Sequence, residues 1–142
     1  MRVGIARYDY DADLRLKIAS QPIPKLNKKG QNAKISANIL SDDEMRANGF
    51  TNRIKTEWSY TKHLVKPDSD ISLYISIPKN NPSDISIDVL DDLFCQPYDY
   101  QHLLDVSPEN EFAFSVYKEV EHCMKLLTDA GIITGHEMGA YI

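Results

Sequence analysis

Apolar and polar residues alternate along three central segments of the chain, which is the period of a β-strand with one buried face. The repeating positions are Ile54, Thr56, Trp58 and Tyr60 in the first segment, Ile71, Leu73, Ile75 and Ile77 in the second, and Ile85, Ile87 and Val89 in the third. Prolines at both ends of residues 78–82 indicate a turn between the last two segments. We therefore predict three adjacent strands of an antiparallel sheet.

The N-terminal part of the chain shows the same period more weakly. Residues 2–10 and 14–20 flank the turn-prone tripeptide at 11–13, which predicts a β-hairpin. Residues 35–39 predict a third short strand. Between them, residues 21–34 contain two prolines, one glycine and four lysines, and we interpret them as a loop.

A short helix is predicted over residues 42–48 from its end signals. Ser41 and Glu44 have the spacing of a capping box, and Gly49 supplies a C-terminal stop. The first turn is acidic, with three consecutive carboxylates from Asp42 to Glu44. These charges suit the positive end of the helix dipole, so we interpret them as capping residues and not as metal ligands.

After Pro97 the apolar period becomes that of a helix. Residues 98–105 predict a short helix, and Ser107 with Pro108 predicts the start of a long one over residues 108–130. The apolar positions of the long helix recur every three or four residues, at Phe112, Val116, Val120, Cys123, Leu127 and Ala130. The last twelve residues are expected to add an edge strand or to pack as a tail.

These elements predict an α+β fold. It comprises an antiparallel sheet of five to six strands, a long C-terminal helix packed on one face, and a short helix inserted after the third strand. The length of 142 residues suits one domain over residues 1–142. Because no apolar run is long enough for a membrane span or a secretory signal, we expect a cytoplasmic protein with no membrane contact. Cys95 and Cys123 are then expected to be free thiols.

The net charge of −5 is unevenly divided. The N-terminal half, residues 1–67, carries 13 Lys and Arg against 7 Asp and Glu, a balance of +6. The C-terminal half, residues 68–142, carries 3 against 14, a balance of −11. Pairing between the halves cannot neutralise all of the acidic charge, so an acidic surface should remain. Such a surface favours a basic partner protein, such as a nuclease or a nucleic-acid-binding protein, and disfavours direct binding of nucleic acid.

Candidate contact residues gather between the third central strand and the helix after it. Tyrosine combines a large apolar area with a polar tip and is frequent in protein contacts. The predicted partner-binding residues are Asp88, Asp91, Asp92, Tyr98, Asp99 and Tyr100. The alternative for the two tyrosines is that they pack the start of the helix. No phosphate-binding glycine loop or catalytic signature is present, so we predict neither a cofactor nor a catalytic residue.

Three other sites remain open from residue types alone. Cys95 with His102 or His122 would make a thiol nucleophile. A zinc site would draw on Cys95, Asp99, His102, His122 and Cys123. A metal-dependent hydrolase or nuclease would use Asp88, Asp91, Asp92, Asp99 and His102. Cys123, however, falls on the apolar face of the long helix, where a small buried residue is expected.

The function that we expect is a small acidic protein that occupies a basic groove of a partner and inhibits it, with carboxylates in place of phosphates. In size, acidity and tyrosine content the chain is analogous to toxin immunity proteins and phage anti-defence proteins. The analogy is one of type and rests on no shared residue. The alternatives are the metal-dependent hydrolase or nuclease and a structural or assembly protein of a larger particle.

Overall fold

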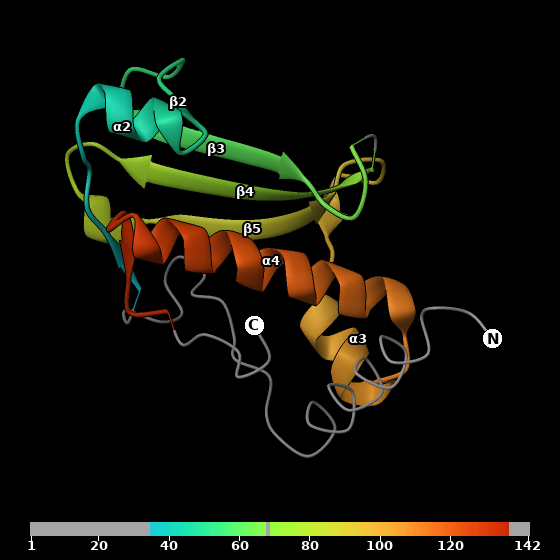
Figure 1. Cartoon of the computed structure of the whole chain (residues 1–142). Helices are drawn as coiled ribbons and strands as arrows, with labels where there is room; N and C mark the ends of the chain where they lie inside the picture. Colours follow the sequence, from blue (N-terminus) through green and yellow to red (C-terminus); the bar gives the residue numbers. More distant parts are fainter. Residues whose placement is uncertain (1–34, 68, 137–142) are drawn as a thin grey trace.

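The structure is a computed structural model that describes residues 35–67 and 69–136 (Figure 1). The hairpin predicted over residues 2–20 and the loop predicted over residues 21–34 lie outside the described residues. Within the described part the fold is α+β, as predicted, with a long helix, shorter helices and two antiparallel sheets.

The larger sheet has five antiparallel strands in the order β2-β3-β4-β5-β6. Their bounds are Phe50–Thr51 (β2), Glu57–His63 (β3), Ile71–Pro78 (β4), Ser86–Asp91 (β5) and Gln96–Pro97 (β6). The register places Tyr60 opposite Ile75, and Ile75 opposite Ile87. From Trp58 onward, the predicted inward positions of the three central strands therefore lie side by side on one face, which forms the core. Ile54 and Thr56, predicted to share that face, are exposed.

The helix α4, Glu111–Asp129, lies across this apolar face (Figure 1). Four of its six predicted apolar-face residues are buried: Val116, Val120, Cys123 and Leu127. The short helix α3, Tyr100–Val106, packs against α4. None of the helices in the described residues combines the length and the apolar character needed to cross a membrane.

The helix α2, Asp42–Ala47, is capped as the sequence predicts. Ser41 Oγ accepts from the Glu44 backbone N–H at 3.2 Å and donates to Glu44 Oε1 at 2.8 Å. Gly49 follows with φ of 93°, and a Cβ there would lie 3.1 Å from Tyr60 Cε2. Glycine therefore allows both the left-handed backbone and the close approach of the helix to β3.

The smaller sheet pairs β1, Ser36–Ala37, with β7, Ile133–Thr134. The third predicted strand thus belongs to this separate sheet, together with the predicted final edge strand. Just after β7, the buried side chain of His136 places its Nε2 2.9 Å from Glu121 Oε2 of α4. This contact ties the segment after β7 to the long helix.

Two predicted boundaries are wrong. The long helix does not begin at Pro108, because residues 107–110 form a turn in which Asn110 N–H donates to Ser107 O at 3.0 Å. Asn110 then caps α4 by accepting from Ala113 N–H at 3.0 Å. The first central strand begins at Glu57 and not at Ile54, because Glu57 N–H closes a turn onto Ile54 O at 3.3 Å.

Candidate functional site

The predicted partner-binding residues follow the chain from β5 into α3. They are Asp88 and Asp91 in β5, Asp92 at the start of the next loop, Tyr98 after β6, Asp99 at the N-cap of α3, and Tyr100 as its first residue. Asp91 and Asp92 lie together where the β5–β6 hairpin turns. Asp88 lies opposite Tyr74 on the face of the sheet that points away from the core.

Tyr100 is a core residue that is 3% exposed, and its ring centroid lies 6.5 Å from that of Tyr117. Burial, and then the nearby Glu121 carboxylate, raises the pKa of the Tyr100 hydroxyl well above its ordinary value. The side chain is therefore not presented to a partner. Of the two roles open from the sequence, Tyr100 has the packing role at the start of the helix.

Tyr98 lies at the surface and is partly buried. Its ring meets Phe112 edge-on, with a centroid distance of 5.8 Å and an interplanar angle of 81°. Burial, and then the Asp91 carboxylate, raises the pKa of Tyr98. Tyr98 thus packs against the first turn of α4 and still lies close to the acidic end of the hairpin.

Asp91 shapes the turn of the β5–β6 hairpin. Its Oδ1 accepts from the backbone N–H of Leu93 at 3.0 Å and of Phe94 at 3.3 Å. An aspartate that binds the amides after it stabilises a local turn. Cys95 then has φ of 53°, in the left-handed region, where the chain returns into β6.

Asp92 connects two neighbouring strands on the outer face. Its Oδ1 accepts from Tyr74 Oη at 2.7 Å, and its Oδ2 accepts from Ser72 Oγ at 2.8 Å. Ser72 Oγ also lies 2.9 Å from His63 Nδ1. Because Ser72 donates to Asp92, its oxygen is left to accept from His63. Ser72 is fully buried, so this network positions side chains and does not present a nucleophile.

The remaining two carboxylates differ in their local roles. Asp99 Oδ1 accepts from the His102 backbone N–H at 3.1 Å and caps α3. The carboxylate of Asp88 makes no hydrogen bond with any described residue. Among residues 35–67 and 69–136, no lysine or arginine forms an ion pair with these two carboxylates, or with Asp91 or Asp92. All four therefore contribute net negative charge to this part of the surface.

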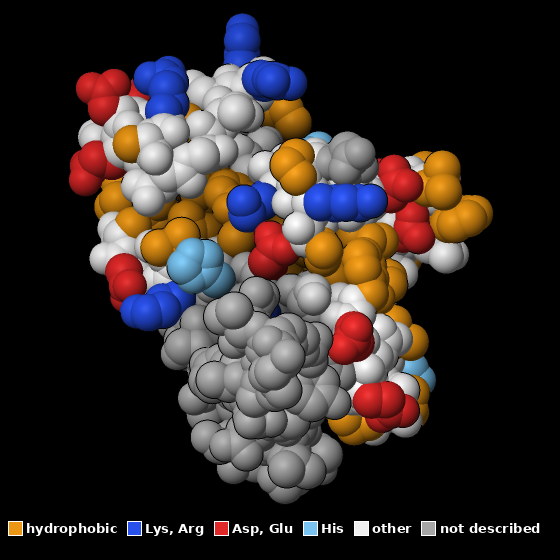
Figure 2. Space-filling view, turned by 45° about the vertical axis from the view of Figure 1, so that its right-hand side comes forward, with side chains coloured by type: hydrophobic (Ala, Val, Ile, Leu, Met, Phe, Trp, Pro, Cys, Tyr) orange, Lys and Arg blue, Asp and Glu red, His pale blue; other side chains and the backbone are white. Residues whose placement is uncertain are grey.

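The feature that the sequence prediction missed is the tip of the hairpin. Leu93 is 65% exposed and Phe94 is 67% exposed, although both are large apolar residues. Figure 2 shows hydrophobic side chains next to carboxylates at the edge of the molecule. A contiguous exposed apolar patch is a feature that can mark a contact site. The signal in the sequence was an apolar pair placed directly after two adjacent aspartates.

The open alternatives for a thiol or metal site have less geometric support. Cys95 is exposed and Cys123 is buried, and both are free thiols. Burial raises the pKa of the Cys123 thiol, which lowers its thiolate fraction. Among the described residues no three His, Cys, Asp or Glu side chains come together as a group that would hold a metal ion. Cys95 Sγ donates to Asp92 O at 3.7 Å and forms no hydrogen bond with a described histidine, so neither alternative has an assembled site within the described residues.

Comparison with known proteins gives a likeness of fold. No protein-family model matches the sequence, and no curated protein is significantly similar to it. Among solved structures, the fold is similar to that in the crystal structure of a DUF1831 family protein from Lactobacillus plantarum, with a TM-score of 0.54. The match covers 77% of this chain and 92% of that chain at 10% sequence identity. At such low identity the similarity shows the fold alone.

Proposed function

We propose that this protein binds a basic partner protein through the tip of the β5–β6 hairpin and the carboxylates around it. The observation that carries the proposal is the adjacent pair Leu93 and Phe94, exposed to 65% and 67%. Large apolar residues on a turn of defined shape are suitable anchors for an apolar pocket. Burying the exposed part of each side chain would contribute at most roughly 1.5–3 kcal/mol, before the entropic cost of association.

The charges along the β5–β6 hairpin and beside its base define the kind of partner. Asp88, Asp91 and Asp99 have no cationic partner among the described residues. A surface rich in lysine and arginine would neutralise these carboxylates and would associate faster at low salt. The partner that fits is therefore a protein whose apolar pocket is bordered by cationic side chains.

A nuclease or another nucleic-acid-handling protein is the partner class that we propose, because its phosphate-binding groove supplies such cations. Occupation of the groove by this protein would exclude nucleic acid, which makes the protein an inhibitor. The carboxylates would take the positions of phosphates, as in a nucleic-acid mimic. Leu93 and Phe94 would add an apolar contact that a phosphate backbone lacks, so binding should weaken with salt without disappearing.

The test compares variants of the full chain in a capture experiment followed by affinity measurements. The tip variant is Leu93→Ser with Phe94→Ser, and its matched control is Leu126→Ser, which is 53% exposed on α4. The charge variant replaces Asp88, Asp91 and Asp99 with Asn. Asparagine keeps the turn of Asp91 and the cap of Asp99 because its side-chain oxygen accepts the same hydrogen bonds. Asp92 stays unchanged because it accepts two hydrogen bonds from β4.

We expect wild type and Leu126→Ser to capture the same basic protein and the tip variant to lose it. The charge variant should bind the purified partner more weakly at low salt and approach wild type at high salt. The partner's nucleic-acid-dependent activity should fall in proportion to the bound fraction. Capture that is unchanged in the tip variant, or a partner without a cationic surface, would contradict the proposal.

A further inference from the structure

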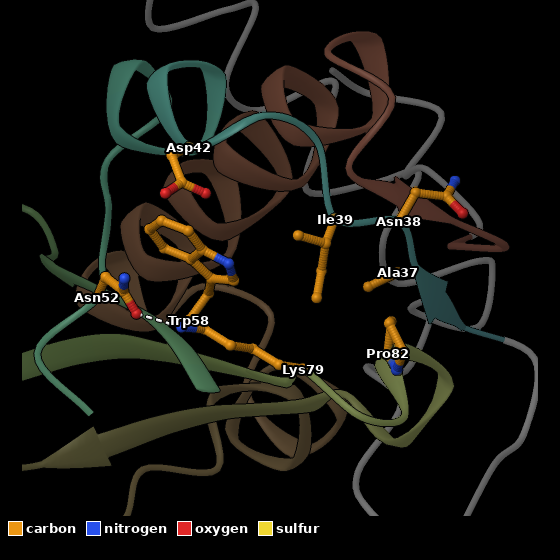
Figure 3. Close-up of a pocket in the computed structure, with 8 residues that line it drawn as sticks. All are labelled: Ala37, Asn38, Ile39, Asp42, Asn52, Trp58, Lys79 and Pro82. Atoms are coloured by element: carbon orange, nitrogen blue, oxygen red, sulfur yellow. Dashed lines mark hydrogen bonds between the residues drawn. The ribbon is translucent and has the colours of Figure 1, made fainter. Parts of the chain in front are cut away.

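A hollow at the opposite end of the sheet from the β5–β6 hairpin is lined by residues from four segments of the chain. The hollow is open to solvent on one side and has a volume of about 490 Å³, within the size range of small-molecule sites. Its lining residues are Ala37, Asn38, Ile39, Asp42, Asn52, Trp58, Lys79 and Pro82. Figure 3 shows Asp42 and Lys79 on either side of the Trp58 ring, with Ile39 and Pro82 across the open space from it.

The two charged groups of the hollow have opposite signs and are not paired with each other. Asp42 forms no ion pair or hydrogen bond through its carboxylate with any described residue, since Arg46 approaches Asp43 instead, at 4.0 Å. The Lys79 ammonium donates to Asn52 Oδ1 and lies 5.3 Å from the centroid of the Trp58 ring. Within the described residues Lys79 has no carboxylate partner, and an ammonium has three donors.

The third polar group is the indole N–H of Trp58. Figure 3 shows the indole nitrogen on the side of the ring that faces Ile39. No described residue accepts a hydrogen bond from this nitrogen. The hollow thus presents two kinds of donor, the Trp58 N–H and the Lys79 ammonium, and one carboxylate acceptor. Ala37, Ile39 and Pro82 supply an apolar wall beside them.

We infer that this hollow binds a free α-amino acid with an apolar side chain. The ligand's carboxylate would accept from Lys79 and Trp58, and its ammonium would donate to Asp42. Its side chain would pack on the wall formed by Ile39 and Pro82. A ligand with both charges satisfies both unpaired groups at once, whereas an anion alone would be repelled by Asp42 and a cation alone by Lys79.

Trp58 makes the binding directly measurable, because the chain has one tryptophan and that residue lines the hollow. The full chain is titrated separately with L-valine, L-leucine, L-isoleucine and L-phenylalanine while tryptophan emission is recorded. For ligands of this size we expect saturation with a Kd between about 10 µM and 1 mM. N-acetyl-L-leucine and L-leucine amide each lack one charge, and each should bind at least about tenfold more weakly than L-leucine.

Two variants test which residue binds the ammonium of the ligand and which binds its carboxylate. Asp42→Asn should abolish the preference for L-leucine over N-acetyl-L-leucine, and Lys79→Gln should abolish the preference for L-leucine over L-leucine amide. The matched controls are Asp43→Asn, from the same helical turn, and Lys55→Gln, because neither residue lines the hollow. Far-UV circular dichroism checks that each variant is folded, and the ligand series on wild type tests the inference without any variant.

The inference fails if none of the four amino acids produces a saturable change. It also fails if a singly charged derivative binds as tightly as free leucine, because the site would then accept a peptide terminus. If Asp42→Asn and Lys79→Gln bind every ligand with the affinity of wild type, the amino acid binds outside this hollow. That result would overturn the inference.

Discussion

The two faces of the five-stranded sheet stabilise the same strands by different interactions. On the face toward α4, Ile75 and Ile87 are 2% and 0% exposed. The opposite face includes five small polar side chains: Ser59, Thr61, Ser72, Ser76 and Ser86. Apolar burial depends on area and is not directional, whereas each hydrogen bond of the outer face depends on one particular partner. The two faces should therefore respond differently to single substitutions.

The largest effect is expected from Ile87→Ala on the covered face. The lost transfer free energy and the cavity should lower the free energy of unfolding by about 2–5 kcal/mol. Urea denaturation followed by circular dichroism measures this change. Ser86→Ala, one residue earlier on the opposite face, is the matched control and should stay within about 0.5 kcal/mol of wild type. Equal losses at the two positions would contradict the difference between the faces.

The next effect is expected from Asp92→Ala on the outer face. The substitution leaves Tyr74 Oη and Ser72 Oγ without their acceptor, which should cost about 1–3 kcal/mol of unfolding free energy. Asp88→Asn on the same face should be close to neutral, because the carboxylate of Asp88 makes no hydrogen bond with a described residue. If both substitutions are neutral in the same urea experiment, the outer network contributes nothing to stability.

Alkaline pH should separate the two faces through their tyrosines. The pKa of both tyrosine hydroxyls is raised. The largest cause is burial for Tyr100 and the hydrogen bond to Asp92 for Tyr74. A raised pKa in the folded state contributes stability that is fully present below the ordinary value of 10.0 and is lost as the pH rises through the folded-state pKa. Each hydroxyl that ionises only in the unfolded chain lowers stability by about 1.4 kcal/mol per pH unit.

Tyr100→Phe should therefore flatten the fall in stability above pH 10 more than Tyr74→Phe does. Urea titrations at a series of alkaline pH values give the two slopes. A wild-type stability that does not change above that pH would contradict the prediction for both residues.

The smallest effects compare two serines that donate to Glu57 Oε2. Ser76 Oγ lies 2.6 Å from this oxygen and Ser59 Oγ lies 3.4 Å from it. Ser76→Ala should cost about 0.5–1.5 kcal/mol of unfolding free energy, and Ser59→Ala less than about 0.5 kcal/mol. Thermal melts of the two variants under identical conditions resolve the difference, and a larger loss for Ser59→Ala would reverse the assignment.

A helix or strand could be predicted where a pattern within its own residues was sufficient to define it. The alternation through Ile71 and Ile87 defined the covered face, and the capping box at Ser41 defined α2. The two-residue strands β2 and β6 could not be predicted, because two residues show no period and form only through their neighbours. The turn over residues 107–110 was missed because Ser-Pro is equally compatible with a helix start and with a turn after a helix.

The candidate site was less predictable than the fold. The run of carboxylates around Asp91 is visible in the sequence, but its role in shaping the turn depends on the backbone conformation. The burial of Tyr100 follows from the position of Tyr117 on another helix. Leu93 and Phe94 are separated from the end of β5 by one residue, and apolar residues so close to a strand are usually core. The completed hairpin establishes that both are exposed.

In the β5–β6 hairpin, the residues that stabilise the turn differ from the residues that are exposed at its tip. Asp91 fixes the turn and Asp92 attaches its base to β4, whereas Leu93 and Phe94 are more than half exposed. We therefore expect substitutions at positions 93 and 94 to change the stability of the fold little. Selection could alter what the tip recognises by changing two codons, and a library randomised at these two positions should consist mostly of folded proteins.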